Sequence, residues 1–275
     1  MLTDYHVHLR PDDREATAAR YFTPENAERY RAAAAERGIA ELGVSEHVHR
    51  FTAGLGVWQH PWWKANATDD IDEYCAFVRE TDLKLGIEAD LVPGREEQMA
   101  ALLDARQWDY VVGSVHFLSD DAVDMRDSEW DIWESHDPDE VWTRYFEALG
   151  DAAASGLFDI LAHPDLVKVW GRSAPLPEGA LRRYYELALP GIEQADVAIE
   201  VSTAGLRKPV GEIYPAPEFL RMCLDLGKPV ALSSDAHLPG DLGHGYEEAV
   251  DLLRGLGVTE IAVFDNRRRR LEPLG

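Results

Sequence analysis

Short apolar runs alternate with longer amphipathic stretches from the first residues of the chain to the last. The short runs are rich in β-branched residues, which is typical of buried strands, whereas the longer stretches repeat apolar residues at helical spacing. Strands that alternate with helices in this order favour parallel pairing and a (β/α) barrel. The expected strands lie near residues 3–8, 39–46, 84–89, 109–115, 158–163, 196–202, 229–234 and 259–264.

Most of the gaps between these strands carry helix signals. The first, PENAERYRAAAAERG, begins with Pro24 at a position that suits a helix start and ends at Gly38. The other expected helices are DIDEYCAFVRET, REEQMAALLDARQ, DPDEVWTRYFEALGDAAASG, PEGALRRYYELALPGIEQ, APEFLRMCLDLG and GYEEAVDLLRGLG. A single barrel can reach about 250 residues or more, so we expect one domain over residues 1–275.

Three long gaps follow expected strand ends: RFTAGLGVWQHPWWKANATDD, FLSDDAVDMRDSEWDIWESHDP and LVKVWGRSAPLPEG. Long ordered loops are often functional, and the active sites of barrels are built after strand ends. Trp58, Trp62 and Trp63 in the first gap are equally consistent with a lid over a pocket and with packing of the loop onto the barrel.

The first expected strand ends in His6-Val7-His8. Residues two apart on a strand point to the same side, so the two imidazoles converge on one point, as a metal site requires. An H-x-H pair alone is a weak signal. Later strand ends carry the same kinds of residue: Glu46 and His47, Glu88, His116, His163, Asp235 and His237.

The C-terminal ends of parallel barrel strands share one face, so these side chains are expected to meet around a single cavity. A mixture of imidazole and carboxylate suits borderline divalent metals. The alternative, a set of unrelated buried polar residues, is disfavoured because so many separate strand ends carry them.

The order H-x-H, E-H, E, H, H and D-x-H resembles the polymerase and histidinol phosphatase (PHP) superfamily over nearly the whole chain. The segments SEH, GIEAD, GSVHF, LAHPDL and SSDAH resemble its histidinol-phosphatase branch, and STAGLRKPVGEIYP is the most specific match. The resemblance implies a distorted (β/α)7 TIM-like barrel, in which one of the eight expected strands is peripheral. It also implies a phosphomonoesterase that hydrolyses L-histidinol phosphate to L-histidinol and phosphate in histidine biosynthesis.

The resemblance further implies a cluster of two or three divalent ions, with Zn, Mn and Fe all compatible with the donor types. The first ion would take His6, His8, Glu88 and Asp235, the second Glu88, His116 and His163, and the third His47 and His237 with a further ligand.

The chain departs from the family pattern just after H-x-H. Many relatives carry another histidine there, whereas this chain offers Asp12 and Asp13. Asp13, Asp12 or the neighbouring Glu46 is expected to supply the missing ligand of the third ion.

The expected chemistry follows from the charge of the ions, which lower the pKa of a bound water and neutralise phosphate oxygens. Asp235 and His237 are the candidate catalytic residues that give a proton to the leaving alkoxide.

Arg207 in GLRKP is the first candidate for binding substrate phosphate, because a planar guanidinium pairs well with phosphate oxygens. A solvated surface arginine is the alternative, which the family motif disfavours. The lesser candidates are Lys208, Arg172, Lys168 and Arg50. Glu200 and Asp165 are expected to orient metal-bound histidines or to bind a substrate amino group.

The composition narrows the list of partners. A net charge of −24 repels a phosphate backbone, so nucleic acid is not an expected partner. The N-terminal residues lack a basic, apolar signal segment and no run reaches about 18 apolar residues, so we expect a cytoplasmic protein without membrane contact. Cys75 and Cys223 are expected to be small buried residues rather than a disulfide framework. The oligomeric state stays open.

Three other functions fit parts of the pattern. A PHP phosphoesterase acting on a sugar, nucleotide or tyrosine phosphate would use the same metal cluster. A non-catalytic PHP interaction module, of the kind attached to replicative polymerases, would not need an intact cluster. A (β/α)8 amidohydrolase also begins with H-x-H but typically bridges its metals with a carboxylated lysine, whereas Glu88 takes that position here.

Overall fold

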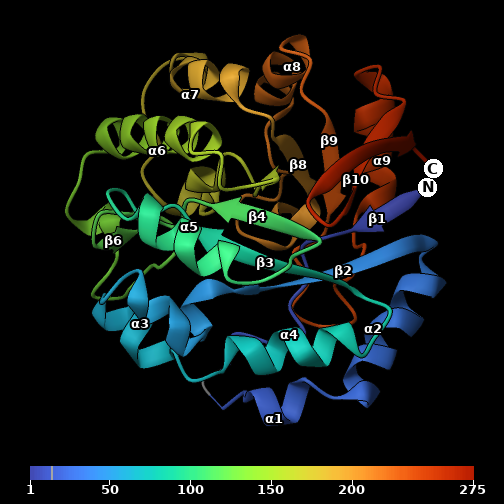
Figure 1. Cartoon of the computed structure of the whole chain (residues 1–275). Helices are drawn as coiled ribbons and strands as arrows, with labels where there is room; N and C mark the ends of the chain where they lie inside the picture. The colour runs from blue at the N-terminus through green and yellow to red at the C-terminus, as the bar shows by residue number, and fades with distance from the viewer. Residues whose placement is uncertain (14) are drawn as a thin grey trace.

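Seven parallel strands form one sheet in the computed structural model, which describes residues 1–13 and 15–275. Their order is β1-β2-β3-β4-β7-β8-β9 (Figure 1). The strands are β1 (Leu2–Asp4), β2 (Ile39–His47), β3 (Lys84–Asp90), β4 (Tyr110–Ser114), β7 (Ile160–Leu161), β8 (Ala198–Ser202) and β9 (Val230–Ser233). A parallel bridge between Val7 and Ala236 joins the two outer strands beyond their ends and nearly closes the sheet into a barrel. The expected distorted sevenfold barrel is therefore confirmed.

The eighth expected strand lies outside this barrel. β10 (Glu260–Asp265) pairs antiparallel with β11 (Arg268–Pro273) in a separate two-stranded sheet. Asn266 and Arg267 join them with positive φ angles of 49° and 58°. A two-residue turn of this kind matches the twist of a hairpin, so the chain reverses here instead of adding a parallel strand.

Two of the barrel strands, β1 and β7, are shorter than the sequence pattern predicts by more than two residues. β1 ends at Asp4, and the H-x-H pair follows it in a segment held from both sides. His8 N donates to Ala236 O at 2.8 Å, and Ser45 N donates to Val7 O at 2.8 Å. The alternation of side chains therefore continues beyond the regular strand, as the two histidines require. β7 is likewise reduced to two residues.

Helices surround the sheet, and each expected helical segment contains one (Figure 1). They are α1 (Ala18–Tyr21), α2 (Pro24–Glu36), α3 (Pro61–Asn66), α4 (Ile71–Arg79), α5 (Glu96–Asp104), α6 (Pro138–Ala154), α7 (Arg182–Gln194), α8 (Pro217–Asp225) and α9 (Tyr246–Gly255). A small hairpin of β5 (Phe117–Leu118) and β6 (Asp121–Ala122) follows β4. Asp70 begins α4 by accepting hydrogen bonds from the backbone of the first turn, as expected of an N-cap.

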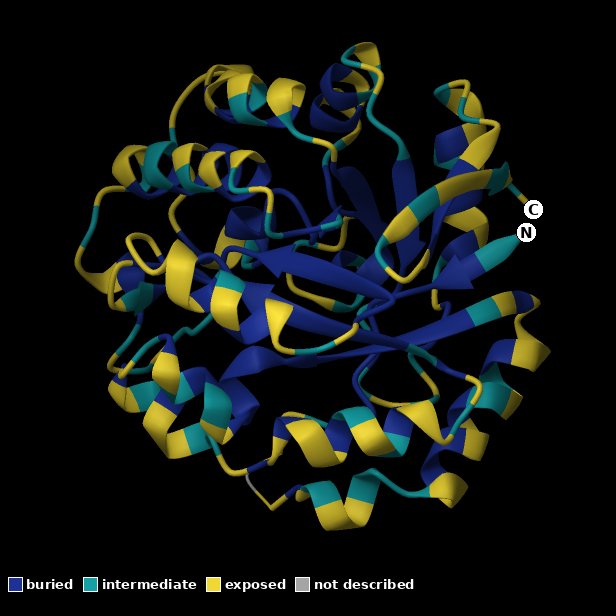
Figure 2. Cartoon of the chain, viewed as in Figure 1, coloured by how far each residue is buried: buried dark blue, intermediate teal, exposed yellow. Residues whose placement is uncertain are grey.

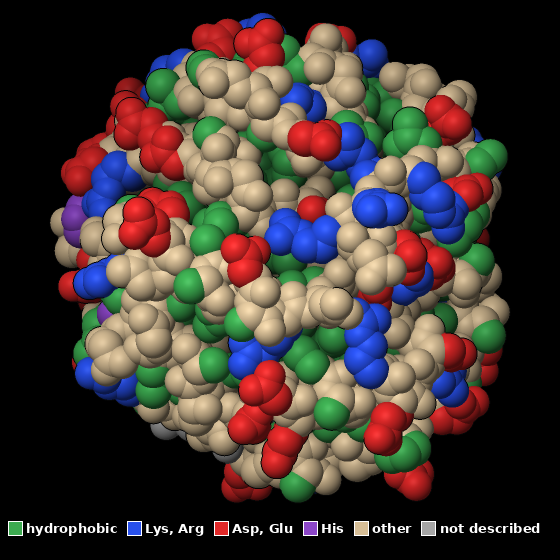
Figure 3. Space-filling view, viewed as in Figure 1, with side chains coloured by type: hydrophobic (Ala, Val, Ile, Leu, Met, Phe, Trp, Pro, Cys, Tyr) green, Lys and Arg blue, Asp and Glu red, His purple; other side chains and the backbone are tan. Residues whose placement is uncertain are grey.

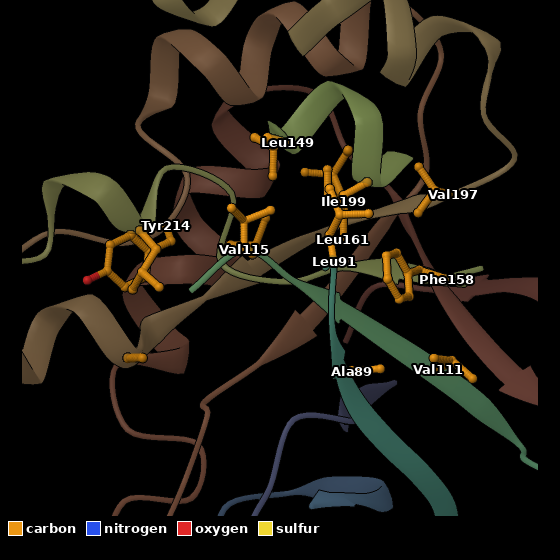
Figure 4. Packing of buried hydrophobic residues seen from close by; sticks show 14 of the residues in the cluster. Ala89, Leu91, Val111, Val115, Leu149, Phe158, Leu161, Val197, Ile199 and Tyr214 are labelled. Atoms are coloured by element: carbon orange, nitrogen blue, oxygen red, sulfur yellow. The ribbon is translucent and has the colours of Figure 1, made fainter. Parts of the chain in front are cut away.

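The core has two layers. Figure 2 shows buried strands surrounded by helices that expose their outer faces. Between strands and helices, Leu161 of β7 and Ile199 of β8 pack near Leu149 of α6 (Figure 4).

The interior of the barrel forms the second layer and is filled at its N-terminal end by aromatic rings. Tyr5 lies 4.9 Å from Tyr110 and 5.7 Å from Phe264 between ring centroids. A Cβ atom on Gly43 or Gly86 would lie 2.4 or 2.3 Å from the Tyr110 side chain, so glycine is needed where this ring crosses the neighbouring strands. We call Tyr5, Tyr110 and Phe264 the aromatic plug.

Within residues 1–13 and 15–275, no helix is long and apolar enough to cross a membrane. Acidic side chains are spread over the visible face of the molecule, with Lys and Arg side chains between them (Figure 3). Cys75 and Cys223 are free thiols; Cys223 is buried as expected, whereas Cys75 is only partly buried.

Candidate metal centre

The strand ends opposite the aromatic plug bring the expected ligand residues together. They are His6 and His8 after β1, His47 at the end of β2, Glu88 in β3, His116 after β4, His163 after β7, and Asp235 and His237 after β9. We call these eight residues the ligand cluster.

Glu88 lies at the centre of the ligand cluster and is almost completely buried. Its Oε2 atom is 3.1 Å from His6 Nε2 and 2.6 Å from His47 Nδ1. Its Oε1 atom faces the other side, 3.4 Å from His116 Nε2 and 3.3 Å from His163 Nε2. One carboxylate thus presents an oxygen to each half of the cluster, which is the geometry of a bridging ligand.

His6, His8 and Asp235 form one compact group in the ligand cluster. Asp235 Oδ1 is 3.4 Å from His8 Nε2 and 3.7 Å from His6 Nε2. The ligand atoms of these three residues all lie within 4.8 Å of one another. The two imidazoles of H-x-H therefore converge on one point, as the strand alternation predicts.

Two further groups of three residues also have their ligand atoms within 4.8 Å of one another. His6, Glu88 and His163 form one of them, and His8, His47 and His237 form the other. His237 Nε2 also lies 3.1 Å from Asp12 Oδ2, so Asp12 is the acidic residue of its loop that reaches the cluster.

Two histidines of the ligand cluster contact a further carboxylate through Nδ1, while their Nε2 atoms face Glu88. His6 Nδ1 is 2.9 Å from Glu200 Oε1, and His116 Nδ1 is 2.7 Å from Asp90 Oδ1. A carboxylate on Nδ1 fixes the proton there and leaves Nε2 free for a metal. Asp90 was not singled out from the sequence, although its position two residues after Glu88 places both side chains on the same side of β3.

The turns that deliver two cluster residues have unusual backbone angles. His163 has a φ of 24° and Asp235 a φ of 49°, in a region that residues with a Cβ rarely adopt. Such angles persist only where surrounding contacts enforce them, and they concentrate at functional sites.

The electrostatics keep the carboxylates of the cluster ionised. Burial acts to raise the pKa of Glu88, but His47 and His6 outweigh it and hold this pKa well below its usual range. Burial likewise acts to raise the pKa of Asp235, yet His6, His8 and His237 hold it well below its usual range. Both carboxylates are therefore in the form that binds a cation.

The pKa values of the cluster histidines His8 and His116 are shifted in opposite directions by their neighbours. Burial, with the nearby His47 and His237, lowers the pKa of His8 well below its ordinary value, so His8 is neutral and ready to bind a metal. Burial would also lower the pKa of His116, but Asp90 and Glu88 outweigh it and raise this pKa to about 10. A metal binding to His116 therefore displaces a proton.

The donor atoms of the cluster lack partners of their own. Within the described residues, buried atoms without a hydrogen bond include His6 Nε2, both ring nitrogens of His8, His47 Nδ1, Glu88 Oε2, Asp235 Oδ1 and His237 Nε2. Buried polar atoms in proteins are nearly always paired, so a concentration of unpaired ones at one point indicates a missing charged partner. Imidazole and carboxylate donors at these distances fit divalent cations.

The carboxylates of Glu46 and Asp13, two of the expected ligands, accept hydrogen bonds from backbone amides. Glu46 is fully buried, and its Oε1 accepts from Leu9 N at 2.7 Å and Arg10 N at 3.1 Å, while its Oε2 pairs with Arg50. Asp13 is exposed, and its Oδ1 accepts from Glu15 N at 2.9 Å. Both carboxylates therefore serve the protein backbone, and Asp12 is the better placed of the three.

Beside the ligand cluster lies a cavity of about 1010 Å³. His47, His116 and Asp12 line it on the metal side. Its other wall is aromatic and consists of Trp62, Phe117, Trp130 and Trp170. His49 also lines this cavity, and its ring lies edge-to-face on Trp62 with 4.4 Å between ring centroids.

The three tryptophans of the first long loop divide between the two expected roles. Trp63 is fully buried and packs the loop onto the barrel. Trp62 lines the cavity beside the ligand cluster, whereas Trp58 packs against Phe117 at 5.1 Å between ring centroids.

Only some of the cations expected to bind phosphate line the cavity. Arg207 Nη2 donates to Ser234 O at 2.8 Å and to Asp235 O at 3.0 Å, so it holds the turn that carries Asp235. Lys168 is buried against Asp165 at 3.1 Å, and Arg172 is exposed outside the cavity lining. Of the candidates, Lys208 and Arg50 line the cavity, and Arg50 is paired with Asp12 and Glu46.

The barrel and the cluster together define a class: (β/α)-barrel proteins with a divalent-metal centre at the C-terminal ends of the strands. Within that class, the chain belongs to the PHP domain family, whose profile matches residues 23–204.

Named relatives agree with this assignment. The chain is similar to a protein named "Probable histidinol-phosphatase" from Deinococcus radiodurans, with 33% identity over 252 residues, 89% of this chain and 91% of the relative. It is similar to "Histidinol-phosphatase" from Bacillus subtilis, with 24% identity over 239 residues, 79% of this chain and 89% of the relative.

A solved structure shares the fold. It is a histidinol phosphate phosphatase from Lactococcus lactis, crystallised with Zn, L-histidinol and phosphate. It aligns with a TM-score of 0.75 and 19% identity, over 98% of each chain. The likeness at this identity supports the architecture, and the chemistry of this chain depends on its own residues.

Proposed function

We propose that this protein is a metal-dependent phosphomonoesterase that hydrolyses L-histidinol phosphate to L-histidinol and phosphate. The observation that carries the proposal is the convergence of unpaired imidazole and carboxylate atoms on Glu88, beside a cavity large enough for an organic phosphate. The names of the relatives, and the L-histidinol and phosphate in the Lactococcus lactis structure, support this substrate. We also propose that residues 1–275 form one PHP domain.

The proposed ligand sets follow the groups that the structure brings together. His6, His8 and Asp235, with Glu88 as the bridge, would hold the first divalent ion. Glu88, His116 and His163 would hold the second. His47 and His237, with Asp12 as the acidic ligand, would hold a third. Zn, Mn and Fe all suit these donors.

When bound, the ions make a water nucleophilic near neutral pH and neutralise the phosphate oxygens that it must approach. In the hydrolysis, the water oxygen bonds to phosphorus, the bond from phosphorus to the ester oxygen breaks, and one water proton ends on the alcohol. Asp235 Oδ1 lies 3.5 Å from His237 Nδ1. Asp235 stays ionised as a ligand, because its pKa is held well below the usual range. The His237 ring is therefore our candidate to hold this proton and pass it to the leaving oxygen when no third ion is bound.

Other residues position the machinery. Glu200 orients His6 and, by accepting from His163 N, also the turn that carries His163. Arg207 holds the backbone of Asp235, and Lys208 at the cavity is our candidate for binding the substrate phosphate. Arg172 does not line the cavity, so the proposal assigns it no role.

A substrate panel tests the proposal. Purified, metal-loaded protein is assayed for phosphate release from L-histidinol phosphate, a sugar phosphate, a nucleoside monophosphate, phosphotyrosine and p-nitrophenyl phosphate. We expect kcat/KM for L-histidinol phosphate to exceed the others by about 100-fold. A higher value for any other monoester would redirect the assignment to that substrate, and metal-loaded protein without activity on the whole panel would favour a non-catalytic PHP module.

A further inference from the structure

The cavity beside the ligand cluster carries a carboxylate that the hydrolysis itself does not use. Asp124 follows the β5–β6 hairpin and lines the cavity together with His116 and the aromatic wall. Its Oδ1 atom is buried and has no hydrogen-bond partner within the described residues. Leaving a buried carboxylate oxygen unpaired is costly, so its persistence at a cavity wall points to a ligand that donates to it.

The backbone next to Asp124 is fixed by three hydrogen bonds. Val123 N donates to His116 O at 2.9 Å, which ties this segment to the strand end that carries a cluster histidine. Val123 O accepts from the indoles of Trp133 at 2.9 Å and Trp170 at 2.8 Å. The carboxylate is therefore attached to a rigid segment at a set position relative to the metal centre, as a binding group requires.

Arg126, two residues after Asp124, also lines the cavity, but its guanidinium is paired with other groups. Arg126 Nε pairs with Asp131 Oδ2 at 3.0 Å, and Arg126 Nη1 donates to Ser173 O at 3.1 Å. Trp130 and Trp170 cover the neighbouring wall with flat apolar surface. The cavity lining also includes Lys208, which is our candidate for the substrate phosphate. The wall next to Asp124 thus offers a carboxylate oxygen without a hydrogen bond beside aromatic rings, which is suited to a cationic ligand that carries a flat group.

We propose that Asp124 determines specificity by binding the ammonium group of an amino-alcohol phosphate, with the rest of the leaving group against the aromatic wall. This inference rests on the proposed function. In L-histidinol phosphate the ammonium group lies on the carbon next to the one that carries the phosphate ester. Asp124 lines the same cavity as His47 and His116, so its carboxylate and the ligand cluster can contact two ends of one bound molecule.

The test compares two substrates that differ only in the amino group: L-histidinol phosphate and its desamino analogue, imidazolylpropyl phosphate. In the Asp124→Asn variant we expect kcat/KM for L-histidinol phosphate to fall about 10- to 100-fold, mainly through KM. We expect kcat/KM for the desamino analogue to change by less than about twofold, with unchanged metal content and melting temperature. Glu134→Gln removes the same charge from an exposed position of the same loop, outside the cavity lining, and should alter neither value.

The possible failures are distinct. Equal losses on both substrates, with reduced metal content, would assign Asp124 to supporting the metal centre and overturn the inference. Unchanged kinetics on both substrates would also overturn it, while the proposed function would stand if the wild type still favoured L-histidinol phosphate. A wild type that handles the two substrates equally well would overturn both this inference and the proposed substrate.

Discussion

The two ends of the barrel have opposite chemistry, although β4 contributes to both. At the N-terminal end, the aromatic plug fills the interior with rings whose centroids lie 4.9 to 6.4 Å apart. At the C-terminal end, the ligand cluster brings imidazoles and carboxylates within 4.8 Å of one another, and several of their atoms lack a hydrogen bond within the described residues. β4 shows both in one element, because it begins at Tyr110 in the plug and leads to His116 in the cluster.

The difference between the two ends indicates that the aromatic plug contributes stability and the ligand cluster contributes function. Rings in the plug stabilise the fold by removing apolar surface from water. Buried charges in the cluster oppose folding unless something neutralises them. In barrel enzymes the C-terminal face carries function and the opposite face carries stability. The variants and treatments below are expected to affect turnover at one end and stability at the other.

Metal removal should have the largest effect on turnover. Dialysis against a strong chelator is expected to reduce phosphate release from L-histidinol phosphate to background, because the cluster then lacks its cations. The melting temperature should also fall, since an ion that binds only the folded state stabilises it. Activity and metal content are measured before and after adding back Zn or Mn. Full activity in protein holding less than about a tenth of its original metal would contradict the proposed role of the cluster.

The substitution Glu88→Gln should have the second-largest effect on turnover. The amide keeps the shape of the side chain but removes the charge that faces both halves of the cluster. We expect kcat to fall about 1,000-fold, because a metal contribution of several kcal/mol is lost at about 1.4 kcal/mol per tenfold. Elemental analysis should show less bound metal. Glu260→Gln, an exposed position at the start of β10, is the matched control and should behave as wild type.

The substitution Asp90→Asn tests the contact between Asp90 and His116 Nδ1, which orients this histidine of the ligand cluster. Asp90 contacts His116 Nδ1 rather than an ion, so we expect a loss of about 10- to 100-fold in metal affinity or activity. Titration with added metal distinguishes this variant from Glu88→Gln, because excess metal should restore much of its activity. A variant that no metal concentration rescues would place Asp90 in direct contact with the reaction.

Phe264→Ala should have the smallest effect on turnover and a large effect on stability. It removes a buried ring that packs on Tyr5, at an expected cost of about 3–5 kcal/mol in the free energy of unfolding. Denaturant unfolding measures this cost, and kcat of the folded protein at low temperature should stay within about twofold. Arg268→Ala, exposed on β11, should change stability by no more than about 0.5 kcal/mol. A marked drop in kcat for Phe264→Ala would show that the two ends are coupled.

The local pattern of the sequence determined most of the fold and the place of the site. Apolar runs of strand length fixed the seven barrel strands to within a few residues at most ends, because burial on both faces demands such runs. The family pattern and the positions of His6, Glu88, His116 and Asp235 at strand ends predicted which side chains would meet. Strand alternation explains why His6 and His8 converge, and it would also have identified Asp90 behind His116.

Only the tertiary structure decided which loop side chains face the cluster. Asp12, Asp13 and Glu46 offer the same carboxylate, and among these three Asp12 reaches His237, because Glu46 is held by the amides of Leu9 and Arg10 and Asp13 accepts from Glu15 N. Arg207 carries the family motif, yet its guanidinium holds carbonyl groups rather than lining the cavity. The pattern of residues 259–264 predicts a strand without saying that its partner is β11 rather than the barrel. Periodicity reports how deeply a residue is buried, whereas the direction of a loop side chain depends on partners that are distant in sequence.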